Sequence, residues 1–274
     1  MTASVAVEPL AQVRPSRQAG VSAFIALLAR DLAVLLKTVR AFLLRTIMQP
    51  LLFVFVFTYV FPKIGQRVSG DFSTLIVPGV IAIALIFQGI QAVALPLVQD
   101  FGYTREIEDR VMAPLPVWGV ALEKMASGAI QGILAAVVVF PLAAFIPVTA
   151  VHLHVNWAIV LTVVPLAAYL SAALGLTIGT RTAPQQVPLL FSVIVIPITF
   201  LGATYYPWGA LKAIPWLKWA VLVNPLVYMS EGFRQALAPQ PLHMNLTVTY
   251  LALIAYSAFL TWAGLAGFRK RVLA

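Results

Sequence analysis

The sequence predicts an all-α membrane protein with six transmembrane helices. Three observations lead to this fold class: 61% of the 274 residues are hydrophobic, only 10% are charged, and the apolar residues are gathered into long stretches separated by short polar segments. Soluble domains carry about a quarter charged residues. About 20 consecutive apolar residues form a helix that is long enough to cross the hydrocarbon of a bilayer.

Two segments precede the first predicted span. Residues 1–20 contain no apolar run, so we expect a disordered cytoplasmic tail. Residues 21–45 carry apolar side chains at helical spacing, with Arg30, Lys37 and Arg40 on another face. This pattern is typical of an amphipathic helix that lies in the lipid headgroup layer, and an ordinary juxtamembrane helix is the alternative. Both interpretations place the segment on the cytoplasmic side.

The six-span region covers residues 46–268. Its first span contains the run FVFVFTYVF, whose period of two is typical of a strand. A membrane barrel strand would alternate apolar with polar residues, so we predict a helix. Glycines four residues apart in the third and fourth spans permit close helix contacts, which we assign to packing inside one subunit. The predicted spans are residues 46–61, 74–98, 125–146, 156–180, 186–206 and 246–268.

Residues 207–238, between the fifth and sixth spans, fit neither a loop nor a span. They hold three of the six tryptophans, and their apolar stretches are interrupted by proline. Such short pieces cannot cross about 30 Å of hydrocarbon, yet they are too apolar for water. We therefore predict re-entrant helices at the outer interface. Asn224 as N-cap and Pro225 at the first helical position predict where the second of these helices begins.

Lysine and arginine set the predicted orientation, because cytoplasmic segments retain an excess of both. With both termini in the cytoplasm, 13 of the 18 basic residues lie on the cytoplasmic side, including those of the terminal segment 269–274. We expect a multi-pass protein of the cell membrane with this orientation. The same bias explains the net charge of +9, so the expected partner of the basic residues is the lipid bilayer and not nucleic acid.

A charged connector, residues 99–124, joins the second and third spans. It holds eight of the 27 charged residues of the chain and five of the nine acids. Charge of this density cannot lie in hydrocarbon, so we predict a water-facing cytoplasmic connector. Residues 103–112 are predicted to form a short helix that ends before Pro114 and Pro116. The exposed residues predicted to bind a soluble partner are Arg105, Glu106, Asp109 and Arg110.

The predicted spans contain no Asp, Glu, Lys, Arg or His. Proton-coupled carriers, intramembrane proteases and lipid transferases need such residues, so the sequence argues against all three. There is no P-loop, so the chain is not expected to hydrolyse nucleotide by itself. No catalytic residue and no cofactor are predicted. His152 and His154 lack a third ligand nearby, and we predict no metal site.

A sparse set of neutral polar and aromatic residues remains inside the spans. Several of them share helix faces in the first, second and fifth spans. They are interpreted either as hydrogen-bonding groups that hold the bundle together or as a path for an amphipathic substrate. The predicted path consists of Gln49, Phe53, Phe57, Gln88, Gln91, Ser192, Thr199 and Tyr206.

Four features together resemble the membrane subunits of ABC-2 type exporters. They are the basic helix that leads into RTIMQPLLFVFVFTYVFP, the connector TREIEDRVMAPLPVWGVALEKM, the helices after the fifth span, and NPLVYMSEGFRQAL. In the connector, Glu106, Pro114 and Lys124 match the family pattern. In the last feature, Asn224, Pro225 and Arg234 match its Asn-Pro…Arg motif. Within this family the sequence resembles daunorubicin-type drug and lipid exporters more than polysaccharide exporters.

The resemblance implies a membrane permease that is not itself an enzyme. Two copies, or one copy and a related permease, would pair, and two separate ATP-binding subunits would bind the connector as a coupling helix. ATP would be bound by those partners, and an amphipathic drug or lipid-like substrate would move outward along the permease interface. The alternatives are export of a lipid-linked polysaccharide, an ion-coupled secondary exporter, and a purely structural membrane subunit.

Overall fold

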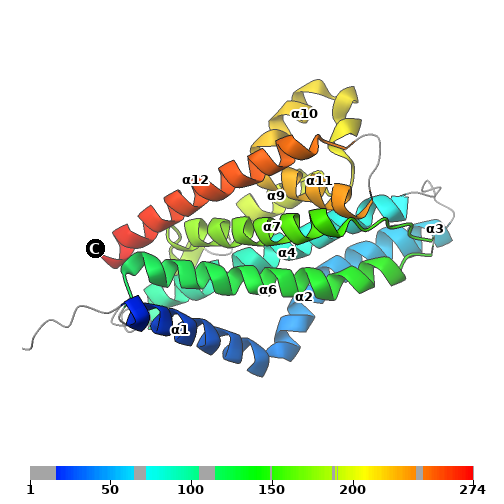
Figure 1. Cartoon of the computed structure of the whole chain (residues 1–274). Helices are drawn as coiled ribbons and strands as arrows, with labels where there is room; N and C mark the ends of the chain where they lie inside the picture. The colour runs from blue at the N-terminus through cyan, green and yellow to red at the C-terminus, as the bar shows by residue number, and fades with distance from the viewer. Residues whose placement is uncertain are drawn as a thin grey trace, which may run out of the picture.

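The structure is a computed structural model that describes residues 17–64, 72–104, 115–148, 150–186, 189, 191–238 and 243–273. Within these ranges every regular element is a helix, so the predicted all-α fold is confirmed. Helices α4 (Phe72–Gln99), α6 (Val117–Phe145) and α7 (Trp157–Gly179) lie side by side, and α12 (Leu246–Val272) runs along one flank (Figure 1). On the other flank, α1 (Arg17–Lys37) and α2 (Val39–Val54) form an elbow.

Six helical segments in the described ranges are long and apolar enough to cross a membrane, which confirms a multi-pass membrane protein. Five of them correspond to predicted spans. The sixth, α1, was predicted to lie in the headgroup layer. The six segments are Gln18–Lys37, Val39–Lys63, Phe72–Gly102, Val117–Phe145, Trp157–Gly179 and Leu246–Val272.

The predicted fifth span, residues 186–206, differs from the structure. Its described part consists of η4 (Phe191–Val195) and α9 (Ile196–Phe200), after which the chain turns. A Cβ at Gly202 would lie 2.5 Å from Leu226 Cδ2, and Ala203 has a positive φ of 52°. A helix cannot continue through that conformation, so the helical part of this segment ends at Phe200.

The break between α1 and α2 lies at Thr38, whereas a single helix was expected from residue 21 to residue 45. The Thr38 hydroxyl donates to the Val34 carbonyl at 2.9 Å, and Thr38 has φ −107°. Threonine that bonds back to the preceding turn bends a helix. Helix α1 also begins at Arg17, inside the segment expected to be an unstructured tail.

The first span is helical despite its strand-like period. Helix α2 continues into a π-helix, η1 (Phe55–Val60), and a last turn, α3 (Phe61–Lys63). Pro62 has no N–H to donate to the Thr58 carbonyl four residues earlier. The backbone N–H of Val148 donates to that carbonyl instead, at 3.2 Å. This bond attaches the end of the first span to the loop after α6.

Helix α4 is the centre of the bundle. Of its most apolar 18-residue stretch 72% is buried, against 0% for α1. The glycine pairs of α6 and α7 pack onto it from two sides. A Cβ at Gly128 would lie 2.3 Å from Val93 Cγ2, and one at Gly175 would lie 2.9 Å from the Ile90 carbonyl oxygen. The predicted close packing inside one subunit is therefore confirmed.

Four short helices follow the fifth span, and their last member anchors the group. These are η5 (Trp208–Ala213), α10 (Pro215–Ala220), η6 (Val221–Val223) and α11 (Pro225–Leu237). The carbonyl oxygen of the Asn224 side chain accepts from the Leu226 N–H at 3.0 Å, so the predicted helix start is confirmed. All 13 residues of α11 are buried, whereas Trp216 and Trp219 of α10 are exposed.

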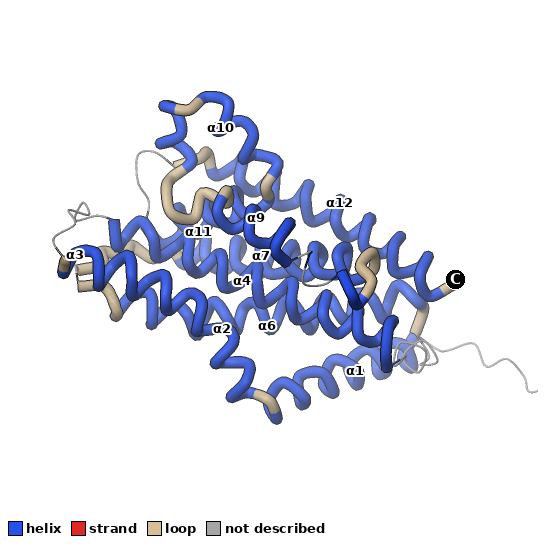
Figure 2. The backbone as a smooth tube through the Cα atoms, turned by 180° about the vertical axis from the view of Figure 1, so that it is seen from behind, coloured by secondary structure: helices blue, strands red, loops and turns tan. Residues whose placement is uncertain are grey.

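Seen from behind, the start of α1 and the end of α12 lie at the same end of the bundle (Figure 2). The π-helix η2 (Asp100–Thr104), with which the charged connector begins, lies there too, because its Phe101 ring packs against Phe268 of α12 at a centroid distance of 5.8 Å. We call this the connector end of the bundle.

Candidate functional site

A cavity of about 940 Å³ lies between α1, α2, α4 and α6. Its wall combines apolar residues, such as Leu35, Phe42 and Leu95, with polar ones. The polar part of the lining extends from the connector end to Gln131 in the middle of α6. It consists of Arg30, Asp31, Thr38, Arg45, Gln91, Gln99, Asp100, Lys124 and Gln131. Of the predicted path residues, Gln91 lines this cavity.

Buried charges close the connector end of the cavity. Lys124 is 4% exposed, and its ammonium lies 3.1 Å from the Asp31 carboxylate and 3.9 Å from that of Asp100. One ammonium thus holds α1, the start of the connector and α6 together. A buried charge that is paired in this way has its desolvation cost offset by its partners.

Two expectations are corrected by this cluster. The connector was expected to face water throughout, but Asp100, Glu123 and Lys124 are buried. The spans were expected to lack ionisable residues, but α6 begins at Val117 and contains two of them. Helix α6 begins directly after Pro116, eight residues before the predicted start of the span. Lys124 is tolerated inside it, and Asp100 beside it, because these charges are paired.

Gln88 lies between helices and not on an open path. It is 3% exposed, and its carbonyl oxygen accepts from the Thr46 hydroxyl at 3.2 Å. Its amide nitrogen donates to the Gln131 side chain at 3.4 Å, and Gln131 donates to Ser127 at 3.4 Å. This chain of bonds joins α2, α4 and α6, which is the packing role that the sequence left open.

Gln49 and Gln91 lie together at a second, small cavity between α2 and α4. Its volume of about 20 Å³ is enough for roughly one water molecule. Arg45 lines both this cavity and the large one. Neither glutamine side chain forms a hydrogen bond with a described residue. These two amides and the guanidinium are therefore available to a ligand.

Phe53 and Phe57 belong to an aromatic cluster that joins the first span to the fifth. The Phe53 ring lies 5.2 Å from the Tyr205 ring and 6.4 Å from the Phe200 ring, and Phe57 lies 6.2 Å from Tyr205, all between centroids. Such pairs contribute about 0.5–1.5 kcal/mol beyond their buried area. The cluster brings two predicted path residues beside the turn that ends the fifth span.

The remaining predicted path residues lie elsewhere. Thr199 is buried, and its hydroxyl donates to the Val195 and Ile196 carbonyls of its own helix, each at 2.8 Å. The Tyr206 hydroxyl donates to the Phe200 carbonyl at 3.5 Å. Ser192 lies in η4, and its side chain is outside the described part of the structure.

Comparison with known proteins decides the family. The family model of the ABC-2 type transporter matches residues 22–238. This chain belongs to the ABC-2 type transporter family. The "Inner membrane transport permease YadH" of Escherichia coli (strain K12) and the protein of the same name from Shigella flexneri are each 27% identical to it over 175 residues. The alignment covers 63% of this chain and 65%, or slightly less than two thirds, of each relative.

The residues predicted to couple this ABC-2 transporter chain to a partner lie outside the described residues. Arg105, Glu106, Asp109 and Arg110 therefore stay predictions, as does the helix that would carry them. The described start of the connector is firmly attached. The Arg271 guanidinium lies 4.7 Å from the Phe101 ring centroid and donates to the Thr182 carbonyl at 2.9 Å.

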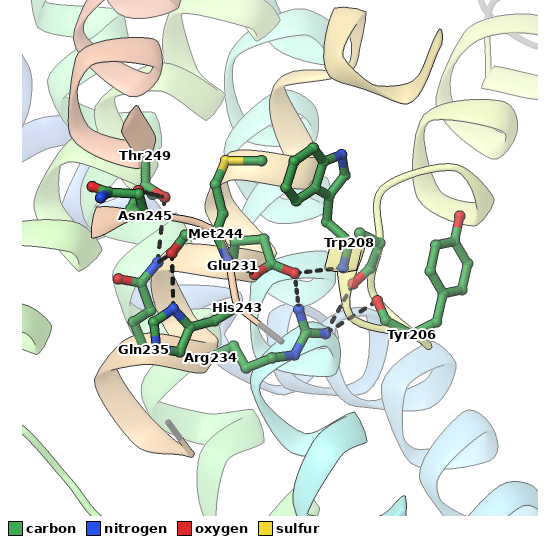
Figure 3. A network of polar contacts seen from close by, with 10 residues as sticks. Tyr206, Trp208, Glu231, Arg234, Gln235, His243, Met244, Asn245 and Thr249 are labelled. Carbon is green, nitrogen blue, oxygen red and sulfur yellow. Dashed lines mark hydrogen bonds and ion pairs between the residues drawn. The ribbon is translucent and has the colours of Figure 1, made fainter. Parts of the chain in front are cut away.

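The motif residue Arg234 of the ABC-2 family pattern lies in a buried polar network (Figure 3). It is 0% exposed and pairs with Glu231, which is also 0% exposed. Arg234 also donates to the Ala203 carbonyl at 2.9 Å. Glu231 accepts from the backbone N–H of Trp208 at 2.8 Å and from that of Met244 at 2.9 Å.

This network joins the turn after the fifth span, the start of η5 and the segment before α12. The sequence singled out Arg234 but not Glu231. The sequence could have indicated Glu231, because it lies three residues before Arg234 and this spacing places both side chains on one face of a helix. Because both charges are used to hold backbone groups, we assign the pair a structural role.

Proposed function

We propose that this chain is the transmembrane subunit of an ATP-driven exporter of the cell inner membrane, which moves an amphipathic drug or lipid-like substrate outward. The observation that carries the proposal is the family match over residues 22–238 on a six-span helical fold whose sequence has no P-loop. A permease without a nucleotide site needs a partner that hydrolyses ATP. The printed name of the relatives, an inner membrane transport permease, supports the location.

In this proposal the partner is a separate ATP-binding subunit that binds the connector. The connector start is attached to α12 through Phe101 and Arg271, and its end continues into α6. A movement imposed on residues 105–114 would therefore reach the bundle through packed elements. A second permease copy, or a related permease, completes the assembly, with both termini cytoplasmic.

The cavity between α1, α2, α4 and α6 and the aromatic cluster supply the two ends of the proposed substrate path. The cavity offers polar and apolar walls near the connector end, and Phe53, Phe57, Phe200 and Tyr205 offer an aromatic surface farther along the first and fifth spans. An amphipathic substrate suits such a combination. Export of a lipid-linked polysaccharide is the second candidate, because the same cavity accepts a lipid with a polar headgroup.

An ion-coupled exporter is less well supported. Two sets of buried ionisable groups are engaged in ion pairs: Lys124 with two aspartates, and Arg234 with a glutamate that also accepts two backbone hydrogen bonds. A proton relay needs a group that can exchange its proton along a path. The paired groups described here are held in place by their partners.

Purification of the tagged chain from its native membrane tests the proposal. We expect an ATP-binding subunit to copurify and the complex to hydrolyse ATP. The chain alone, after the partner has been removed with mild denaturant and refolding has been checked, should show no hydrolysis. Hydrolysis by the single chain, or the absence of any copurifying nucleotide-binding protein, would contradict the proposal.

A further inference from the structure

We propose that Arg45, together with Gln49 and Gln91, forms a binding site for the phosphate or carboxylate group of an amphipathic anion. The inference rests on the proposed transport function and names the chemical class of its substrate. The site lies where the large cavity meets the small one, since both are lined by Arg45 and Gln91.

The charge of the cavity lining supports an anionic ligand. Two cations of the lining, Arg30 and Lys124, form ion pairs with two acids of the lining. Asp31 lies 3.8 Å from Arg30 and 3.1 Å from Lys124, and Asp100 lies 3.9 Å from Lys124. Arg45 is the fifth charged residue of the lining, and it forms no ion pair or hydrogen bond with any described residue. The lining of the cavity therefore keeps one positive charge that its own residues do not neutralise.

The position of Arg45 places its charge on a membrane-spanning segment, where the side chain is exposed on the described chain and also lines both cavities. It lies six residues into α2, about 9 Å along the helix axis from its start, within a segment long and apolar enough to span a membrane. A charged side chain within a membrane-spanning segment is unfavourable unless it is paired or reaches water. An anionic headgroup beside the guanidinium would offset this cost.

The surrounding groups fit the shape of such a ligand. A guanidinium presents its N–H groups as a planar fork that matches phosphate and carboxylate oxygens. The side-chain amides of Gln49 and Gln91 add N–H donors at the same wall. Leu35, Phe42 and Leu95 line the large cavity, so an apolar body attached to the anion has surface to contact. In Figure 1 the elbow of α1 and α2 lies beneath α6.

The test is a binding measurement without nucleotide, so it does not depend on ATP-driven transport. The full chain is placed in nanodiscs of phosphatidylcholine and titrated with a fluorescent short-chain phosphatidic acid. A diacylglycerol with the same chains and fluorophore serves as the neutral probe, and inorganic phosphate serves as a competitor. We expect the anionic probe to bind the wild-type chain at least tenfold more tightly than the neutral one.

The variants separate the site from general attraction to a basic surface. Arg45→Gln should weaken binding of phosphatidic acid about tenfold, because it removes charge-assisted hydrogen bonds. Arg45→Lys should give an intermediate affinity, because it keeps the charge but not the planar fork. Arg40→Gln is the matched control, since Arg40 is an exposed arginine of the same helix, as Arg45 is, but does not line either cavity. Its affinity should stay within twofold of wild type.

Unchanged binding in Arg45→Gln, or an equal loss in Arg40→Gln, would overturn the inference. Equal affinity of the wild-type chain for the neutral probe would also overturn it. Competition distinguishes the source of the anion. Displacement of the probe by millimolar inorganic phosphate would support the site and assign it to a free anion, whereas retention of the probe would support the site and assign it to a lipid headgroup.

Discussion

Gln88 and Gln91 lie three residues apart on α4, yet their surroundings differ. Gln88 is bonded to Thr46 and Gln131, whereas Gln91 lines two cavities and has no described hydrogen-bond partner. The sequence could place both on one helix face, because that follows from their spacing. The sequence could not show that Gln88 is hydrogen-bonded to described residues and Gln91 is not, because the residues that bond Gln88 belong to α2 and α6.

These surroundings predict different effects of the same substitution. Gln88→Leu should lower the free energy of unfolding by about 1 kcal/mol, since interhelical hydrogen bonds in membranes contribute about 0.6 and at most about 1.7 kcal/mol. Gln91→Leu should leave stability unchanged within about 0.5 kcal/mol and change the transport rate more than threefold. Denaturation in mixed micelles and a transport assay measure the two effects. Identical behaviour of the variants would contradict the distinction.

The Glu231–Arg234 pair predicts a larger loss of stability. Glu231→Ala leaves the Arg234 guanidinium buried without its carboxylate, and breaking a buried pair in this way costs about 3–5 kcal/mol. The substitution also removes the acceptor of the Trp208 and Met244 N–H groups. The free energy of unfolding is measured by denaturation of the purified chain.

Lys212→Gln is the matched control for that measurement. Lys212 lies in η5 of the same region but is exposed, so its replacement should change stability by less than about 0.5 kcal/mol. If Glu231→Ala were as stable as this control, the network in Figure 3 would not hold η5 and the segment before α12 against α11.

At the scale of elements, hydropathy predicted the positions of most membrane-spanning helices. It did not predict where a helix begins or ends when contacts with distant residues determine that position. The fifth predicted span ends early because Gly202 packs against Leu226, a residue 24 positions later. The start of α6 lies at Val117 because paired charges are tolerated inside it, and a sequence does not show which charges are paired. The break at Thr38 had a local signal, the threonine hydroxyl, but many helical threonines do not break a helix.

The connector is the element whose prediction is most open to test. Glu106→Arg and Arg110→Glu should weaken binding of the ATP-binding subunit about tenfold or uncouple ATP hydrolysis from export, because close charge pairs across an interface can contribute more than about 1.5 kcal/mol. Insertion of the spans should be unaffected. Pull-down of the partner and substrate transport measure both effects.

Arg269→Glu is the control for the connector variants. Arg269 is exposed near the end of α12, whereas its neighbour Arg271 contacts Phe101 and the end of α7 and would not serve. Many exposed charges contribute almost nothing to binding or stability. If the connector variants behaved like Arg269→Glu, the partner would bind elsewhere.

The whole molecule is organised around α4, which α6 and α7 contact through glycine pairs. The membrane class followed from composition, because a chain with 10% charged residues has too few polar groups for a soluble surface. The all-α class followed from the long apolar stretches, which do not alternate with polar residues as barrel strands do. The proposed substrate path and the proposed energy source, ATP hydrolysis by a partner, do not follow from composition. They depend on a cavity that four helices form together and on a partner that no residue of this chain replaces.

Our central proposal is that ATP hydrolysis by a partner drives transport through this chain. The most direct measurement uses inside-out membrane vesicles that contain the chain with its copurified ATP-binding subunit, with a fluorescent amphipathic substrate added outside the vesicles. We predict uptake that requires ATP, is abolished by vanadate, and persists when a protonophore dissipates the proton gradient. Uptake that needs no ATP and stops with the protonophore would contradict the claim and favour an ion-coupled exporter.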